Sequence, residues 1–282
     1  MSKGKYMKTV IGLDVGTSTI KIVLMNERRE ILCTERYAVS ETENSPEDVV
    51  RSFLSRNALT PDQICRVMTT GAGASFIKED ILGIPTVRVP EVEVMAEGGL
   101  YLSGLEKAVV VSFGTGTTVA SVSLENGARH AGGLALGGGT LSGLSVRLFG
   151  TDRFEDLLRL ARAGDTCNAD KTIGDISSEV ISILPKYATA SNLAKVSAET
   201  RDEDIAAGLF NMLYQAGGTL AVFEARNSGV DKIIAVGSLA ALDLAKQMLT
   251  QVAEIYGYSF VFPPNAAYAT AAGAALRAFR EM

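Results

Sequence analysis

The sequence predicts an α/β protein built from two related halves. Strand-like apolar runs alternate with helical patterns along the chain, which is typical of sheets covered by helices. A layout of one strand, a glycine loop and a hairpin occupies residues 9–37 and begins again at residue 108. No shorter repeat is visible, so a solenoid is not expected. Two related halves with a cleft between them are the expected arrangement.

The composition is that of an ordinary globular protein. The chain has 282 residues, of which 47% are hydrophobic and 21% are charged, so it can bury a sizeable core in one large or two medium domains. The formal net charge is −5, and lysines and arginines form no cluster. We therefore expect neither nucleic acid nor a membrane surface among the partners of this protein.

The three cysteines, Cys33, Cys65 and Cys167, are far apart and form no CxxC pair. This spacing indicates neither a disulfide framework nor a zinc or iron-sulfur site, and it fits a reducing cytoplasm, where we expect the protein to be located. No stretch is expected to span a membrane. Residues 1–6 are interpreted as a short disordered leader, with Met7 as an alternative start.

The first half is predicted to begin with three strands joined by tight turns over residues 8–37. Ser45 is expected to cap a helix whose first residue is Pro46, because acidic residues and then apolar positions at helical spacing follow. The other elements expected here are a strand over residues 66–70, a helical stretch over residues 75–81 and a helix that ends near residue 102.

The second half is predicted to begin with a buried apolar strand over residues 108–112. Its other expected elements are strands over residues 117–124 and 231–236 and helices over residues 154–163, 205–226 and 266–279. The apolar stripe over residues 205–226 is interpreted as a core helix rather than a partner surface. The closing helix is rich in alanine, so it can pack closely on a neighbour.

Four segments combine glycines with threonine or serine, at residues 12–21, 112–118, 133–140 and 235–238. Glycine lets backbone N–H groups approach phosphate oxygens, and the hydroxyl groups add further donors. The first segment lies between two strand patterns, which predicts a β-hairpin phosphate loop, and Lys21 adds a positive charge there. Together these loops indicate a protein that handles a nucleoside triphosphate.

With these segments the chain resembles the type II pantothenate kinases, members of the acetate kinase, sugar kinase, heat-shock ATPase and actin superfamily. The similarity covers nearly the whole chain. It rests on DVGTSTIK (residues 14–21), TTGAGA (69–74), IPTVRVPEVEVMAEGGLYL (84–102), SFGTGTT (112–118), GGGT (137–140), RAGDTCNADKTIGDI (162–176), IIAVGS (233–238) and PPNAAYATAAGAAL (263–276).

The resemblance implies a fold of two ribonuclease H-like domains of the actin-like ATPase superfamily, with an ATP cleft between them. The N-terminal domain is expected over residues 7–102 and the C-terminal domain over residues 103–265. The closing helix, residues 266–282, is a candidate to pack on the N-terminal domain. The resemblance also implies a homodimer, with the helix around residues 209–223 as the expected interface element.

The activity implied is transfer of the ATP γ-phosphate to the primary hydroxyl of pantothenate, the first step toward coenzyme A. A hydroxyl is a poor nucleophile near neutral pH, so a carboxylate is expected to accept its proton while loops and Mg²⁺ hold the phosphates. Glu91 lies where the family places this base. Glu93 and Glu97 are alternatives that share a helix face, a pattern that by itself indicates a solvated acidic surface.

The family's nucleotide contacts can be carried over residue by residue. They are Asp14 near Mg²⁺ through water; Gly16, Thr17, Ser18, Thr19 and Lys21 at the β- and γ-phosphates; Thr115 and Gly116 in a second phosphate loop; Gly138, Gly139 and Thr140 at the nucleotide; Phe154 beside adenine; and Gly237 and Ser238 at the nucleoside. For Phe154, an ordinary place in the core is an equally good interpretation.

The chain departs from the family at the acceptor end of the site. Thr118 is expected to contact the acceptor, but His130 stands where family members usually carry an arginine that helps to hold pantothenate. Arg129 is adjacent, yet neighbouring residues of a strand face opposite sides, so it cannot replace that arginine without a register slip. The departure puts the choice between pantothenate and pantetheine in question more than the phosphoryl transfer.

Two other functions remain as alternatives. One is another small-molecule kinase of the same superfamily, although the cysteine and histidine zinc motif usual in repressor-related sugar kinases is absent. The other is a non-catalytic ATPase that activates a hydroxyacyl-CoA dehydratase through an iron-sulfur cluster shared between two subunits. That function needs facing cysteines, whereas Cys65 and Cys167 are expected in apolar surroundings.

Overall fold

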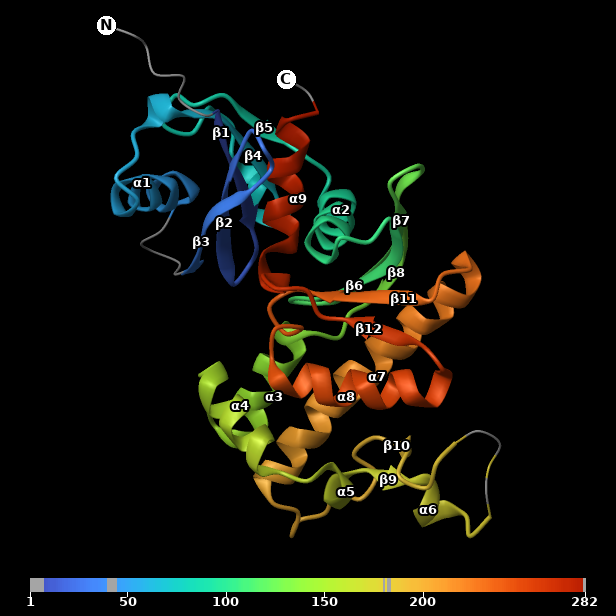
Figure 1. Ribbon diagram of the computed structural model, residues 1–282. Helices are drawn as coiled ribbons and strands as arrows, with labels where there is room; N and C mark the ends of the chain where they lie inside the picture. Colours follow the sequence, from blue (N-terminus) through green and yellow to red (C-terminus); the bar gives the residue numbers. More distant parts are fainter. Residues whose placement is uncertain (1–7, 40–44, 180, 182–183, 281–282) are drawn as a thin grey trace, which may run out of the picture. The chain divides into compact units, whose positions relative to one another are not determined.

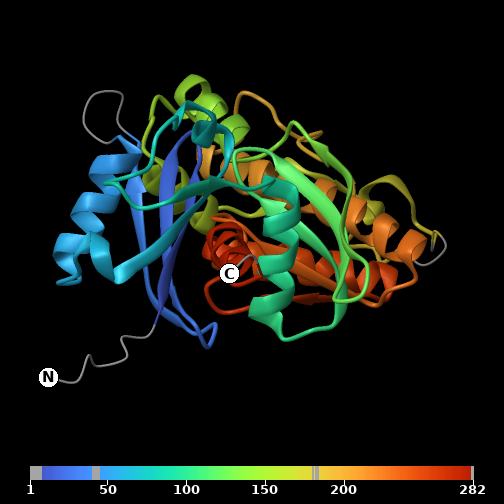
Figure 2. The ribbon, with the colours of Figure 1, turned by 90° about the horizontal axis from the view of Figure 1, so that it is seen from above.

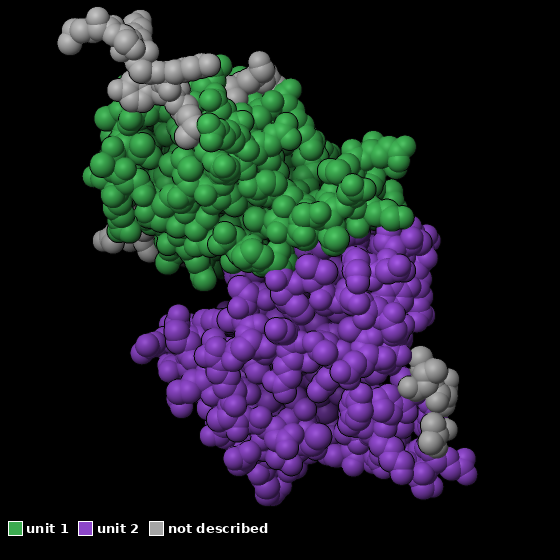
Figure 3. All heavy atoms as spheres, viewed as in Figure 1, with its two compact units in different colours: residues 1–107, 120–130, 263–282 green, residues 108–119, 131–262 purple. Residues whose placement is uncertain are grey.

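The computed structural model describes residues 8–39, 45–179, 181 and 184–280. The predicted leader and the alternative start at Met7 lie outside the described residues. The chain forms two compact units, coloured green and purple in Figure 3. Unit 1 comprises residues 1–107, 120–130 and 263–282, and unit 2 comprises residues 108–119 and 131–262. Both units are therefore discontinuous in the sequence.

The sheet of unit 1 has the strand order β3-β2-β1-β4-β5. Its strands are β1 (Thr9–Val15), β2 (Thr19–Asn26), β3 (Ile31–Ala38), β4 (Ile64–Thr70) and β5 (Thr86–Arg88). The strands β1, β2 and β3 pair in antiparallel fashion, whereas β1, β4 and β5 run parallel. The three strands predicted at the start of the chain are confirmed.

Helices cover both faces of this sheet, as Figures 1 and 2 show. α1 (Pro46–Arg56) packs on one face, against side chains that include Ile11. α2 (Glu91–Ser103) and α9 (Ala269–Ala278) lie on the other face, where Val10 joins their core. Because β1 is covered on both sides, its apolar residues form a continuous run rather than an alternating one.

Glycines allow α9 to pack against both α2 and β1. A Cβ atom on Gly98 of α2 would lie 1.8 Å from the carbonyl oxygen of Ala269, and one on Gly273 of α9 would lie 1.8 Å from that of Val94. A Cβ atom on Gly12 of β1 would lie 1.9 Å from the carbonyl oxygen of Ala271. Any side chain at these three positions would force the backbones apart.

The start of α1 was correctly predicted, whereas the helical stretch over residues 75–81 was not. The Ser45 hydroxyl accepts a hydrogen bond from the backbone N–H of Asp48 at 3.1 Å, as expected of a helix cap. Further on, only a short 3₁₀ helix, η2 (Ala72–Phe76), forms. The backbone of Ile77 is extended, with φ −80° and ψ 115°, so the helix ends at Phe76.

The second sheet has the order β12-β11-β6-β7-β8. Its strands are β6 (Lys107–Phe113), β7 (Thr117–Ser123), β8 (Gly127–Leu134), β11 (Lys232–Val236) and β12 (Ser259–Val261). Read from the opposite edge, this order repeats that of the first sheet, and β11 is parallel to both β6 and β12. The doubled layout predicted from the sequence is therefore real.

Unit 2 is mainly helical outside its strands. The elements are α3 (Gly138–Phe149), α4 (Phe154–Ala163), the short helices α5 (Thr166–Ala169) and α6 (Ile173–Ile176), the short strands β9 (Lys171–Thr172) and β10 (Thr189–Ser191), α7 (Asp202–Ser228) and α8 (Asp243–Tyr256). The helix α4 has the predicted bounds, whereas the sequence analysis missed α8 and assigned the start of α3 to a turn.

The helix α7 forms the centre of the unit 2 core. Phe210 and Tyr214 are fully buried on it, and its residues pack with those of α4 and α8. Contrary to the expectation that no stretch could span a membrane, α7 is long and apolar enough to do so. However, 67% of its apolar window is buried in the structure, as in the core helix of a globular protein. The core interpretation is preferred.

Candidate active site

Three parallel strands of unit 1 bring functional side chains to one edge of the sheet. Asp14 lies near the carboxyl end of β1, Gly71 directly follows β4, and Arg88 ends β5. Glu91 comes three residues after Arg88, at the first residue of α2. Open α/β sheets bind ligands at the carboxyl ends of their strands, so this edge is where a ligand is expected.

Asp14 and Lys21 form an ion pair across the β1–β2 hairpin. The two residues face each other in the strand register, with Lys21 Nζ 3.6 Å from Asp14 Oδ2. Both are buried, with exposed fractions of 7% and 9%. Burial raises the pKa of Asp14, and the positive charge and hydrogen bond of Lys21 partly oppose that rise. The pair is thus held inside the protein directly beneath the predicted phosphate loop.

Glu91 is exposed but lies within the electrostatic reach of this pair. Partial desolvation of its carboxyl raises the pKa of Glu91, the negative charge of Asp14 raises it further, and Lys21 lowers it. A general base functions best when its pKa is closer to the working pH than that of a free glutamate. The surroundings of Glu91 therefore suit the role that the resemblance assigns to it.

A pocket of about 330 Å³ opens beside Glu91. It is lined by Gly71, Ala72, Arg88, Val89, Pro90 and Glu91. Gly71 has a φ of 91°, and a Cβ atom there would lie 2.9 Å from Asp14 Oδ1. Glycine at this position therefore lets the wall of the pocket approach the Asp14 carboxylate closely.

The alternatives to Glu91 are engaged elsewhere. Arg277 of α9 donates hydrogen bonds to Glu93 at 2.6 Å and to Glu97 at 2.8 Å, and Arg280 donates to Glu97 at 3.2 Å. Glu97 is only 8% exposed, so the interpretation of this face as a solvated acidic surface was wrong. Within the described chain, Glu91 is the carboxylate of these three that no arginine or lysine pairs with.

The predicted phosphate loop of unit 1 is the tight turn of the β1–β2 hairpin. The Gly16 N–H donates to the Thr19 carbonyl at 3.1 Å, and a Cβ atom on Gly16 would lie only 2.9 Å from that oxygen. Thr17 and Ser18 are exposed at the tip. The hairpin thus presents backbone and hydroxyl donors at the end of β1, two residues beyond Asp14.

The second glycine loop connects β6 and β7 in unit 2. Its N–H at Gly114 donates to the Gly116 carbonyl at 2.9 Å, which leaves Thr115 exposed at the tip. The backbone N–H groups of Gly138 and Gly139 donate to the carbonyls of Gly114 and Thr115, at 2.8 and 3.0 Å. The first turn of α3 therefore supports the Thr115 loop.

The remaining predicted nucleotide residues also lie in unit 2. Thr140 caps the start of α3, with its hydroxyl 3.4 Å from the Gly137 N–H. Gly237 has a φ of 94°, and a Cβ atom there would lie 2.5 Å from the Phe113 carbonyl oxygen. Ser238, which follows it, is half-buried. This close approach places Gly237 of the AVGS segment directly against the end of β6.

Phe154 and the two predicted acceptor residues differ in their surroundings. Phe154 is half-buried and packs edge to face on Phe210, with ring centroids 6.1 Å apart, as a core aromatic does. Thr118 is half-buried on β7, and His130 is exposed on β8. Neither Thr118 nor His130 lines the pocket beside Glu91. Their roles with the acceptor remain predictions.

The sequence analysis missed Arg88 and Gly71. Arg88 lies within the segment that carries Glu91, and a lone cation three residues before a candidate base is a signal that could have been noticed. The glycine after β4 belongs to the TTGAGA segment, but only the structure shows which carboxylate it approaches. Both residues depend on the pairing of β4 with β5, which joins Thr69 to Arg88.

The acidic residues of this site fit Mg²⁺. This ion is commonly held by one or two carboxylates together with waters and substrate phosphates. Asp14 supplies a carboxylate at the end of β1, and the Glu91 carboxyl lies near enough to feel its charge. Among the described residues, no three His, Cys, Asp or Glu side chains converge on one point.

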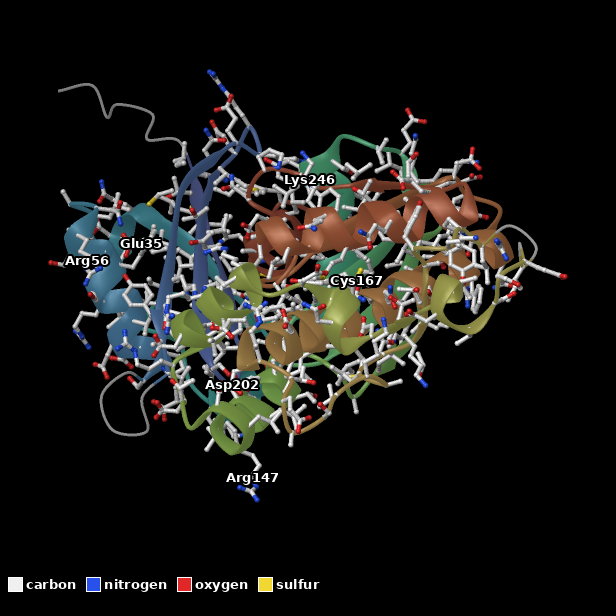
Figure 4. The ribbon with its side chains drawn as sticks, turned by 90° about the horizontal axis from the view of Figure 1, so that it is seen from below. Glu35, Arg56, Arg147, Cys167, Asp202 and Lys246 are labelled. Atoms are coloured by element: carbon white, nitrogen blue, oxygen red, sulfur yellow. The ribbon has the colours of Figure 1, made fainter. Side chains whose placement is uncertain are left out.

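Cys65 and Cys167 were expected in apolar surroundings, but the structure does not place both of them there. Cys33 and Cys65 are half-buried, and Cys33 Sγ donates to Asn57 Oδ1 at 3.3 Å. Cys167 on α5, labelled in Figure 4, is exposed, and charged groups such as Asp165 and Lys195 act on its thiol. The expectation was wrong for Cys167 because its short helix lies at the surface.

The two repeated sheets and their glycine hairpins define an α/β protein of the actin-like ATPase fold. An activator of 2-hydroxyisocaproyl-CoA dehydratase from Clostridium difficile, solved with bound ADPNP, matches with a TM-score of 0.68 at 19% identity, over 97% of this chain and 95% of that one. A ROK family glucokinase from Streptomyces griseus matches with a TM-score of 0.56 at 16% identity, over 95% and 98%. These likenesses confirm the predicted fold class.

The model of the Fumble family matches residues 107–276. The chain belongs to this family. The type II pantothenate kinase of Bacillus cereus strain G9842 is 28% identical over 282 residues, covering 96% of this chain and 99% of that one. The type II pantothenate kinase of Bacillus thuringiensis subsp. konkukian is 29% identical over 241 residues, covering 82% and 83%.

Proposed function

We propose that this protein transfers the γ-phosphate of ATP to the primary hydroxyl of pantothenate, the first step of coenzyme A synthesis. The observation that carries the proposal is Glu91, a carboxylate of raised pKa that lines a pocket beside the Asp14–Lys21 pair. The relatives named type II pantothenate kinase support the choice of acceptor. Phosphoryl transfer needs a base near the hydroxyl and positive charge near the phosphates, and this edge of unit 1 offers both.

In this mechanism Glu91 accepts the proton of the acceptor hydroxyl as its oxygen attacks the γ-phosphorus. The donors of the hairpin at residues 16–19 and the Lys21 ammonium hold the phosphates in line with that oxygen. Asp14 would hold Mg²⁺ through water, and the bound ion would neutralise charge that develops on the phosphate oxygens. In unit 2, the resemblance assigns phosphate contacts to the Thr115 loop and the nucleoside to Gly237 and Ser238.

We further propose a cytoplasmic homodimer that accepts pantothenate or pantetheine and binds neither nucleic acid nor membranes. The net charge of −5 and the wide spacing of the cysteines favour this environment. The apolar helix α7 lies mostly in the core, but Phe223 near its end is 52% exposed. This end of α7 is the part that a second subunit could cover.

The direct test is ADP release by the purified protein with ATP, Mg²⁺ and a panel of acceptors: pantothenate, pantetheine, N-acetylglucosamine and acetate. We expect turnover with pantothenate well above the rate without acceptor, and none above that rate with the sugar or acetate. Turnover with the sugar or acetate instead would indicate another kinase of the superfamily. A brown, iron-containing protein that hydrolyses ATP without phosphorylating any acceptor would indicate a dehydratase activator.

A further inference from the structure

Arg88 lines the pocket that holds the proposed base, and none of the described side chains pairs with it. It ends β5, it is exposed, and it lines the same pocket as Glu91. Within the part of the chain that the structure describes, its guanidinium makes neither an ion pair nor a side-chain hydrogen bond. By contrast, Arg277 at the far face of α2 is fully engaged by Glu93 and Glu97.

Opposite charges line this pocket without neutralising each other. Arg88 and Glu91 are separated by Val89 and Pro90, and no ion pair joins them. The Val89 N–H donates to the Thr69 carbonyl at 2.9 Å, and its own carbonyl accepts from the Thr70 hydroxyl at 3.1 Å. Because this backbone is fixed to β4, and Pro90 has a fixed φ and restricts the residue before it, the fold sets the backbone spacing between Arg88 and Glu91.

The other cation at this edge, Lys21, is already paired with Asp14 and does not line the pocket. The pocket is therefore lined by both the proposed base and a guanidinium that no described side chain pairs with. Its volume of about 330 Å³ suits a small organic molecule. A molecule that places a hydroxyl at Glu91 and an anionic group at Arg88 matches both charges.

We propose that Arg88 binds the carboxylate of the acceptor and so selects acidic acceptors over neutral ones. This inference rests on the proposed function, since pantothenate carries its carboxylate at the end opposite to the reacting hydroxyl. A planar guanidinium can hold a carboxylate through two parallel hydrogen bonds. In this proposal the β1–β2 hairpin and Lys21, rather than Arg88, bind the phosphates of ATP.

The test compares pantothenate with pantothenol, in which a neutral alcohol replaces the carboxylate. In Arg88→Gln, we expect the ratio of kcat/KM for pantothenate to that for pantothenol to fall about ten- to a hundredfold, the usual effect of losing a hydrogen bond to a charged group. The loss should appear mainly as a higher KM for pantothenate. Arg88→Lys keeps the charge and should restore part of the ratio.

The matched control is Arg28→Gln, which removes an exposed arginine of the β2–β3 turn outside the pocket and should leave the ratio unchanged. Thermal unfolding of each variant checks that it is folded. If Arg88→Gln alters both acceptors equally or neither of them, this inference is wrong while the proposed function stands. If the wild-type protein phosphorylates neither acceptor, both the proposed function and this inference are wrong.

Discussion

At the scale of single residues, the proposed base is shaped by charges that come from other elements. Glu91 begins α2, but Asp14 of β1 and Lys21 of β2 both act on its pKa. Resemblance to known kinases pointed to Glu91 and Asp14 from the sequence. It could not point to the pairing of Glu93 and Glu97 with Arg277, because those residues are 184 and 180 positions apart and meet only in the folded unit.

Replacing the base should stop the chemistry while sparing the nucleotide. We expect Glu91→Gln to lower kcat about 10²- to 10⁴-fold, since the amide keeps the shape of the side chain but cannot accept the proton. Equilibrium ATP binding should change little. Glu93→Gln is the control and should keep near-normal turnover, because Glu93 faces Arg277. The opposite pattern would transfer the role of base to Glu93.

The pH profile should reflect the raised pKa of Glu91. A base acts only when deprotonated, so kcat/KM should decline as the pH falls through its pKa, and a raised value moves that decline to higher pH. We expect the midpoint of this decline in kcat/KM at a pH above about 4.3, the pKa typical of free glutamate. Pantothenol is the acceptor to use, because it has no carboxylate that titrates in this range. A midpoint at or below that value would contradict the assigned environment.

At the scale of elements, prediction worked where the pattern is local. The bounds of α4 were correct, and those of α2 and α7 were nearly so, because the apolar spacing that predicts them lies within each segment. The stretch at residues 75–81 failed because the backbone becomes extended at Ile77, directly after the short helix η2. The first turn of α3 was taken for a loop because its glycines are poor helix formers, yet bonds to the Thr115 loop hold it.

The close packing of α9 on α2 predicts that two glycine-to-alanine substitutions change the free energy of unfolding in opposite directions. Gly273→Ala would push a methyl group to 1.8 Å from the Val94 carbonyl oxygen, so we expect a loss of about 1–3 kcal/mol in the free energy of unfolding, or more. The control is Gly143→Ala in α3, where a Cβ atom meets nothing within 4 Å. That change should stabilise the protein by about 0.5–1 kcal/mol. Urea unfolding measures both, and equal effects would refute the packing argument.

At the scale of the whole molecule, the sequence revealed the repetition but not its full extent. The strand–loop–hairpin unit was visible twice, whereas the matching positions of β5 and β12 were not, since each is only three residues long. The closing helix was expected as a candidate to pack on the first domain, whereas the return of residues 120–130 to unit 1 was not predicted. Residues 120–130 join unit 1 through contacts that no local pattern records.

The proposed dimer can be tested at the exposed end of α7. We expect sedimentation equilibrium at micromolar concentration to give twice the chain mass of 29.8 kDa. Phe223→Ser should shift the protein toward the monomer, because it removes a large apolar side chain that is 52% exposed. The control is Phe76→Ser, at a residue 83% exposed in unit 1. A monomeric wild-type protein would exclude the dimer.

The position of α9 has a consequence for how the protein is made. This helix covers one face of β1, yet it leaves the ribosome later than every segment of unit 2. All residues of unit 2 have been made once residue 262 has emerged. At that point the surface of β1 around Gly12 is not yet covered by α9. A nascent chain stalled after residue 262 should therefore protect unit 2 from proteolysis but leave unit 1 open to cleavage. The carboxylates of Asp14 and Glu91 gain a stable setting only after α9 has emerged.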